Sequence, residues 1–280
     1  MSGTTLSPAA SPVDASRPSP AKAGPTQLRA INSELVKMRT LRSTALTLLA
    51  AVIGLAGLGL LISAVTNSNF SHMDPGELAR FDPVGRSLGG VNIAQLAIGV
   101  LGVLLISGEY GTGMVRSTFA AIPTRLPVLW AKTGLYAVVT FLVMAPSAFV
   151  AFLGGQQLLG KHGTTLSSPH ALRAVVGVAL YLTVVAVLAV ALGFIVRSTA
   201  GGIAALFALL LVLPGLGNLL PTSWQTNVLP YLPSNAGSAL YTLHPDNPGT
   251  LAPWTGFAVM CLWAAVTLVT AAIVLKRRDV

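Results

Sequence analysis

The side chains best suited to chemistry lie in one short polar segment, residues 107–118, with the sequence Ser-Gly-Glu-Tyr-Gly-Thr-Gly-Met-Val-Arg-Ser-Thr. It contains an acid, a phenol and a base, in this order: Glu109, Tyr110 and Arg116. Gly111 and Gly113 permit a sharp turn, and a short helix over residues 112–121 can follow. An exposed group of this kind is a good docking element for a soluble partner. An ordinary interfacial loop, whose arginines only fix topology, has the same composition, and both interpretations stay open.

The rest of the chain offers little for catalysis. It has no Gly-x-x-x-x-Gly-Lys-Ser/Thr loop that would hold ATP phosphates. The four histidines lie outside the apolar runs, without the spacing of a zinc site, so His162 and His170 are best interpreted as solvated loop residues. The one cysteine, Cys261, lies in an apolar run. We expect no catalytic residue, no metal site and no cofactor bound by this chain.

Composition indicates that lipid is the solvent for most of the surface. Of the 280 residues, 53% are hydrophobic and 9% are charged, and the mean hydropathy is +0.75. Soluble domains have about 25% charged residues. The net charge of +9 would suit nucleic acid, but the basic residues lie between apolar runs and form no stripe. We therefore expect a lipid bilayer as partner and no nucleic acid.

Six apolar stretches have the roughly 20 residues that a helix needs to cross a bilayer. They are 44–65, 88–107, 128–154, 174–196, 201–220 and 253–275. Helices are favoured over strands because they satisfy their own backbone groups in lipid, and the runs do not alternate as barrel strands do. The one full charge inside these limits is Lys132, about a turn from an end.

Lys and Arg are distributed unequally between the two sides. With the N-terminus inside, 13 of the 17 lie on the cytoplasmic side: Arg17, Lys22, Arg29, Lys37, Arg39, Arg42, Arg116, Arg125, Lys132, Arg197, Lys276, Arg277 and Arg278. The other four lie outside: Arg80, Arg86, Lys161 and Arg173. Because positive loops stay in the cytoplasm, we expect a multi-pass protein of the cell (inner or plasma) membrane with both termini cytoplasmic.

The regions outside the spans have distinct compositions. Residues 1–27 are rich in Ser, Pro and Ala and are expected to be a disordered tail. Apolar residues then recur at helical spacing from Leu28 to Leu41, which predicts an amphipathic elbow helix on the membrane surface, or else a continuation of the first span. The 221–252 segment combines prolines with aromatic residues, and we expect short interfacial helices there.

Two polar residues lie inside the second predicted span. Asn92 and Gln95 are one turn apart and either line a transport pathway or form hydrogen bonds between helices. No ionisable residue lies deep in any predicted span, whereas proton-coupled carriers usually have one. The sequence therefore favours a transport protein whose energy comes from outside the chain. A self-contained carrier or channel is the alternative, and a membrane-embedded enzyme has no recognisable catalytic set.

Several of these segments resemble one family. The pattern Gly-Glu-Tyr-x-x-Gly-x-x-Arg-x-Thr from Gly108 to Thr118 resembles the loop after the second span of ABC-2 type permeases. Residues 33–44 are similar to the elbow before their first span, and Leu-Pro-Ser-Asn-Ala-Gly at 232–237 resembles a segment of their last outer loop. The Lys-Arg-Arg-Asp at 276–279 is typical of their ends. The resemblance covers residues 28–280, which would form one six-helix transmembrane domain.

The resemblance implies a mechanism. Two such permeases, alike or homologous, pair with two separate ATP-binding cassette subunits, which bind ATP and Mg. The 108–127 segment would be the coupling loop, with Glu109, Tyr110 and Arg116 as contacts and Gly111 and Gly113 as the turn. Three elbow residues would be secondary contacts: Glu34, Lys37 and Arg39. The loop has one acidic residue, so a coupling contact through two acids is not implied. Export of a small hydrophobic molecule is expected, while lipid, polysaccharide or ion export stays open.

Overall fold

A computed structural model describes residues 35, 42–113, 126–243 and 249–277, and this part of the chain is helical without strands. Six helical segments in it are long and apolar enough to cross a membrane: 42–72, 91–111, 126–162, 171–196, 199–217 and 253–277. The predicted all-α fold with six spans is confirmed. The predicted tail and elbow helix lie outside the described residues, apart from Leu35.

Three of the six spans are interrupted or extended by other helix types, and the other three are single α-helices. The first span consists of α2 (Arg42–Val52), a π-helix η1 (Ile53–Gly57), α3 (Leu58–Asn69) and η2 (Phe70–His72). The next three are α6 (Val91–Gly111), α8 (Leu126–Leu159) with η3 (Gly160–His162), and α9 (Ala171–Val196). The last two are α10 (Thr199–Phe207) with a π-helix η4 (Ala208–Val212) and α11 (Leu213–Gly217), and then α14 (Pro253–Arg277).

Short helices occupy the connections. The connection between α3 and α6 contains α4 (Pro75–Ala79) and α5 (Pro83–Ser87). The 221–252 segment, where the sequence predicts short helices, contains α12 (Thr222–Asn227), η5 (Leu229–Tyr231) and α13 (Pro233–Ser238). Trp263 on α14 donates a hydrogen bond from Nε1 to the Tyr231 carbonyl at 2.9 Å, so this segment is held against the last span.

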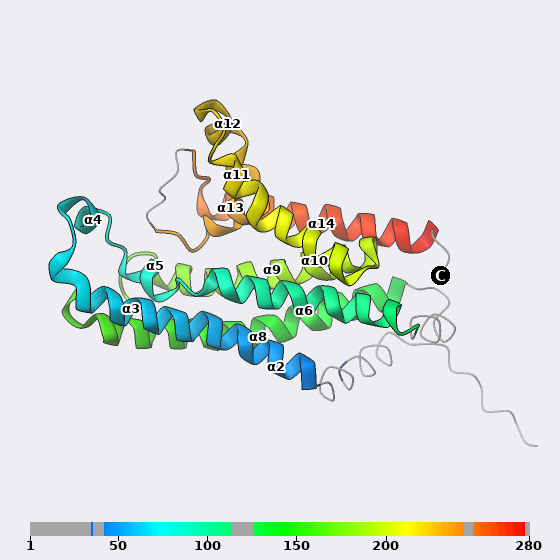
Figure 1. Ribbon diagram of the computed structural model, residues 1–280, viewed down its shortest axis with the longest axis horizontal. Helices are drawn as coiled ribbons and strands as arrows, with labels where there is room; N and C mark the ends of the chain where they lie inside the picture. Colours follow the sequence, from blue (N-terminus) through cyan, green and yellow to red (C-terminus); the bar gives the residue numbers. More distant parts are fainter. Residues whose placement is uncertain (1–34, 36–41, 114–125, 244–248, 278–280) are drawn as a thin grey trace, which may run out of the picture.

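The centre of the bundle is α9, whose most apolar stretch is 72% buried inside the protein, against 22% for α14. It packs against α6, α8, α10 and α14. Figure 1 shows α6 and α9 between a layer of α10, α11 and α14 and a layer of α2, α3 and α8. A helix that is apolar on all sides must be covered on all sides or face lipid, and α9 is mostly covered by protein.

The directions of the spans follow from contacts between α6 and α9. Gln95 meets Tyr181 near the start of α6, and Ile106 meets Gly193 near its end, so the second and fourth spans run parallel. Thr199, at the start of α10, donates a hydrogen bond to a residue near the end of α6, so the fifth span runs the opposite way. The chain therefore crosses back and forth. In Figure 1 α2 begins and α14 ends toward the same end of the bundle.

The first span approaches the end of α5 and the residue just before α6 backbone to backbone. A Cβ added at Gly90 would lie 2.2 Å from the Gly54 carbonyl oxygen and 2.3 Å from that of Leu55. A Cβ at Gly59 would lie 2.0 Å from the Ser87 carbonyl oxygen. Small residues permit such close packing where there is no hydrophobic driving force between helices in lipid.

A buried glutamine ties α8 to the connection before α6. The Gln156 amide donates to the Pro83 carbonyl at 2.9 Å and to Ser87 Oγ at 2.7 Å, and its Oε1 accepts from the Thr164 backbone N–H at 2.7 Å. Buried amides are stable only when their hydrogen bonds are satisfied. This interaction fixes two connections at the same end of the bundle.

We predict that Gly90→Ala destabilises the protein by about 1–3 kcal/mol, because a methyl group there must push backbone atoms apart. The matched control is Gly134→Ala on α8, where an added Cβ meets nothing within 4 Å; it should be neutral or stabilise by up to about 1 kcal/mol. Thermal unfolding in one detergent measures both. Equal unfolding temperatures would contradict the close packing of the first span against Gly90.

Candidate functional site

The last turn of α6 carries a buried ion pair. Lys132 Nζ of α8 donates to Glu109 Oε1 at 2.9 Å, and the two side chains are 6% and 14% exposed. Separating buried opposite charges is costly, so such a pair holds two helices together. The sequence suggested Glu109 as a contact for a partner protein and did not identify this internal contact. The signal was present, because Lys132 is the one full charge inside a predicted span and needs an acid nearby.

Two further contacts tie the same turn to the connection between α9 and α10. The Arg197 guanidinium lies over the Tyr110 ring, with its central carbon 5.2 Å from the ring centroid, a cation–π geometry. Arg197 has φ of 57° and ends α9 in the left-handed region. Thr199 Oγ1 donates to Ser107 Oγ at 2.9 Å. The end of α6 is therefore held by the third, fourth and fifth spans together.

The helix ends where the sequence places a turn. Gly111 is the last residue of α6, and Gly113 has φ of 72°, which glycine adopts without strain. Thr112 Oγ1 donates to the Gly108 carbonyl at 2.9 Å and closes the last turn. Arg116 and most of the helix expected over 112–121 lie outside the described residues, as do the elbow residues Glu34, Lys37 and Arg39. Their roles as partner contacts stay predictions.

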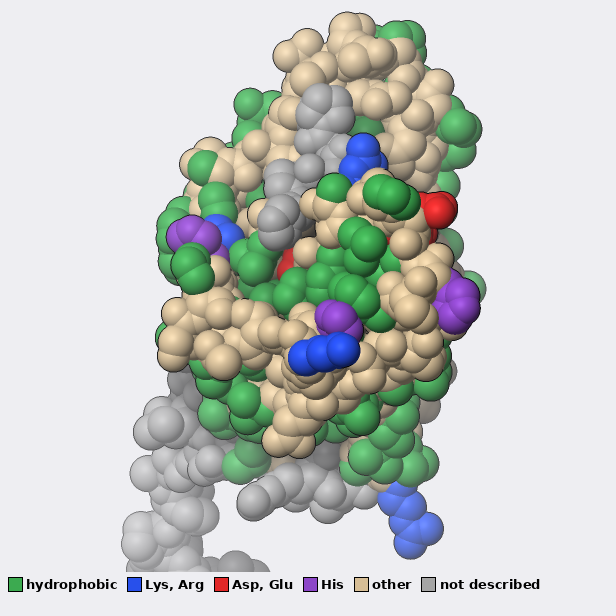
Figure 2. All heavy atoms as spheres, turned by 90° about the vertical axis from the view of Figure 1, so that its left-hand side faces the viewer, with side chains coloured by type: hydrophobic (Ala, Val, Ile, Leu, Met, Phe, Trp, Pro, Cys, Tyr) green, Lys and Arg blue, Asp and Glu red, His purple; other side chains and the backbone are tan. Residues whose placement is uncertain are grey.

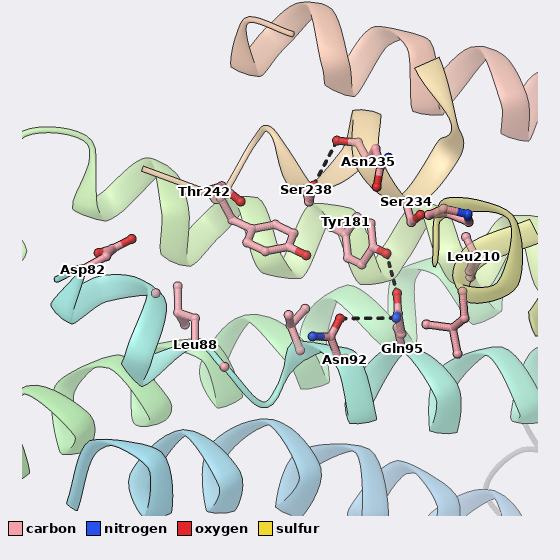
Figure 3. A pocket seen from close by; sticks show the side chains of 16 residues that line it. Asp82, Leu88, Asn92, Gln95, Tyr181, Leu210, Ser234, Asn235, Ser238 and Thr242 are labelled. Atoms are coloured by element: carbon pink, nitrogen blue, oxygen red, sulfur yellow. Dashed lines mark hydrogen bonds between the residues drawn. The ribbon is translucent and has the colours of Figure 1, made fainter. Parts of the chain in front are cut away.

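A second candidate site is a pocket of about 530 Å³ toward the other end of α6. It lies between α6, α9, η4 and the 234–242 segment that includes α13, with α5 at its edge. Figure 3 shows polar side chains of α6, α9 and the 234–242 segment around it, with Leu210 of η4 beside them. Predicted pathway residues Asn92 and Gln95 both line this pocket.

A hydrogen-bonded chain of side chains crosses the pocket wall. The Tyr181 hydroxyl of α9 donates to Gln95 Oε1, and Gln95 Nε2 donates to Asn92 Oδ1 at 3.5 Å. Gln95 is 2% exposed, so its amide would be costly without these partners. The sequence left two interpretations of Gln95 open, an interhelical hydrogen bond and a pathway lining. The interhelical bond is present, and the same residue also lines the pocket.

The side of the pocket formed by residues 234–242 is held in place by its own hydrogen bonds. Asn235 Nδ2 donates to the Leu229 carbonyl at 3.0 Å, and Ser238 Oγ donates to the Asn235 carbonyl at 2.9 Å. A Cβ added at Gly237 would lie 2.6 Å from the Tyr181 ring, so α13 rests directly on α9. The sequence at 232–237 resembles a segment of an outer loop, but it did not predict that this segment would face α6 and α9 across a pocket.

Several ionisable groups lie at the pocket end of the bundle. Figure 2 views this end, with Lys, Arg, acidic and His side chains around an apolar central patch. The His162 ring stacks on Phe70 with centroids 3.5 Å apart. Within the described ranges, no three His, Cys, Asp or Glu side chains are grouped so that they could hold a metal ion.

No known protein family and no curated protein sequence matches this chain. The resemblance to ABC-2 type permeases therefore depends on the motifs quoted above.

We predict that Glu109→Gln and Lys132→Met each destabilise the protein by about 2 kcal/mol, because each removes the largely buried ion pair between α6 and α8. The double variant should lose clearly less stability than the sum of the losses of the two single variants. Lys161→Met, which removes an exposed lysine beyond the other end of α8, is the control and should change little. Additive costs in thermal unfolding would show that the pair is not coupled.

Proposed function

We propose that this chain is the permease subunit of an ABC-2 type exporter. It would form the translocation path, couple to a separate ATP-binding cassette subunit that binds ATP and Mg, and work with a second permease copy or homologue. The transported molecule would be small and hydrophobic. The termini would face the cytoplasm, in the cell membrane.

The observation that carries this proposal is the anchored end of α6. The Glu109–Lys132 ion pair and the Tyr110–Arg197 contact join three spans at the point where the chain leaves for the 114–125 connection. A force applied by a partner to that connection would reach the second, third and fourth spans together. An interfacial loop that only fixes topology needs no such anchoring.

Charge supports the same orientation. Five of the nine Lys and Arg side chains in the described part lie at the end of the bundle where α2 begins and α14 ends: Arg42, Lys132, Arg197, Lys276 and Arg277. Counted over the whole sequence, 13 of the 17 belong to this side in the expected topology. The other end has Asp74, Glu77 and Asp82 beside its basic residues. Positive residues on the cytoplasmic side are the rule for membrane proteins, so the 114–125 connection would face a cytoplasmic ATPase.

The energy source also favours an external ATPase. In the described spans, full charges lie within about two turns of a helix end, and the Glu109–Lys132 pair already neutralises itself. Carriers driven by protons usually have a carboxylate or histidine near the membrane centre. The alternative, a self-contained carrier or channel, is favoured by one observation, the polar pocket beside Gln95 and Tyr181, which would serve either kind of transporter.

We predict that the chain co-purifies with a separate ABC ATPase subunit from its own cell, and that Arg116→Glu weakens this association about tenfold. Reversing a charge at a protein–protein contact typically costs at least 1.4 kcal/mol, which is tenfold in affinity. Arg80→Glu, an exposed arginine at the other end of the bundle, is the matched control and should bind like the native chain.

The readouts are the recovered ATPase and its hydrolysis rate in nanodiscs with and without the permease. If the Arg116 and Arg80 variants bound the ATPase equally well, this result would contradict the proposed coupling role of residues 108–127. Transport by proteoliposomes that contain this chain alone would favour the self-contained carrier.

A further inference from the structure

The pocket beside α6 has the volume of a ligand site. Its volume of about 530 Å³ falls within the roughly 300–1,000 Å³ of small-molecule sites. Tyr181, at its inner wall, is the eleventh residue of α9. At 1.5 Å per residue it lies about 15 Å along that helix, near the middle of a hydrocarbon core about 30 Å thick. The pocket thus extends from the 234–242 segment toward the centre of the membrane.

The polar groups of the pocket suit an uncharged ligand. Among the described residues that line it there is no Lys or Arg, so an anion would find no counter-charge. Its one charged side chain, Asp82, caps α5 by accepting the Val84 backbone N–H at 2.9 Å through Oδ1. The remaining polar lining consists of amides and hydroxyls, which recognise other amides and hydroxyls.

Hydrogen-bonding capacity remains unused there. Ser234 Oγ is buried and has no hydrogen-bond partner. A buried hydroxyl without a partner is unfavourable, and a bound polar group would supply the missing hydrogen bond. Burial raises the pKa of the Tyr241 hydroxyl above its ordinary value, so this phenol stays protonated and able to donate. Ser234 and Tyr241 both line the pocket from the 234–242 segment.

Apolar side chains complete the lining. Leu88 follows α5, and Leu210 and Leu211 belong to the π-helix η4. Single-turn π-helices within α-helical segments occur frequently at functional sites. An apolar wall opposite amide and hydroxyl groups suits a molecule that is itself apolar on one side and polar on the other.

We infer that this pocket binds an uncharged amphiphile, with hydroxyl or amide groups against Gln95, Ser234 and Tyr241 and an apolar part against Leu88, Leu210 and Leu211. The inference rests on the proposed function in that the ligand would be the transported molecule. Binding to the pocket itself requires no ATPase, so it can be tested on this chain alone.

The probe is octyl glucoside with a diazirine at the end of its alkyl chain, added below its micelle concentration to the chain in lipid nanodiscs. After photolysis, mass spectrometry locates the labelled peptides. We expect label in 85–95 and 207–214, the segments of the apolar wall, that unlabelled octyl glucoside displaces better than octyl sulfate or octyltrimethylammonium. Stronger displacement by the ammonium compound would show that Asp82 selects cations and would overturn the uncharged class.

Two variants test the site itself. Gln95→Leu keeps the side-chain size but removes the amide, and should weaken specific labelling about tenfold; Ser238→Trp should block it by filling the pocket. Tyr136→Phe is the matched control, because Tyr136 is equally buried and donates to the Ile98 carbonyl of α6 away from the pocket; it should stay within twofold of the native chain. Thermal unfolding checks that each variant is folded.

Labelling that spreads over the lipid-facing helices and ignores Gln95→Leu would mean partition into bilayer lipid and would overturn the site. Failure of ATPase association with intact pocket labelling would remove the proposed coupling but leave this site standing. Loss of pocket labelling with intact ATPase association would overturn this site and leave the proposed coupling standing.

Discussion

The burial of α9 is the constraint on which the rest of the bundle depends. Four other spans pack against this helix, so its surface must be apolar and closely fitted. Gly177 and Gly193 allow Leu240 and Ile106 to approach its backbone. A buried polar atom on such a helix needs a hydrogen-bond partner, and a long side chain finds it on a neighbouring helix. The Tyr181 hydroxyl therefore requires an acceptor from another span, and Gln95 of α6 supplies it.

The second span connects the two candidate sites. Gln95 and Glu109 lie on the same unbroken helix, 14 residues and about 21 Å apart. Both are held by other spans, Gln95 by α9 and Glu109 by α8. A tilt of α6 would therefore strain contacts at both of its ends at once. In the proposed transport function, an ATPase that docks at the Glu109 end of α6 would therefore change the pocket at the Gln95 end.

The spans could be predicted from sequence because lipid imposes one simple rule, a long run of apolar residues. The same rule misplaces the ends: the third run was expected to stop at Gly154, yet α8 continues to Leu159. Gln156 looks like a loop residue by polarity, but it is buried and bonded to Pro83 and Ser87. Hydropathy measures preference for lipid and does not register a polar residue that another segment satisfies.

Contacts between distant segments could not be predicted, because periodicity does not say which helix faces which. The pairing of Glu109 with Lys132 changes what a coupling contact can be. With 14% of the side chain exposed and one oxygen bonded to Lys132, Glu109 has little surface left for another protein. Tyr110 is likewise placed under Arg197. A partner that docks here would contact residues after Gly113. Glu109 and Tyr110 would hold the end of α6 in place, and the later residues would make the contact with the partner.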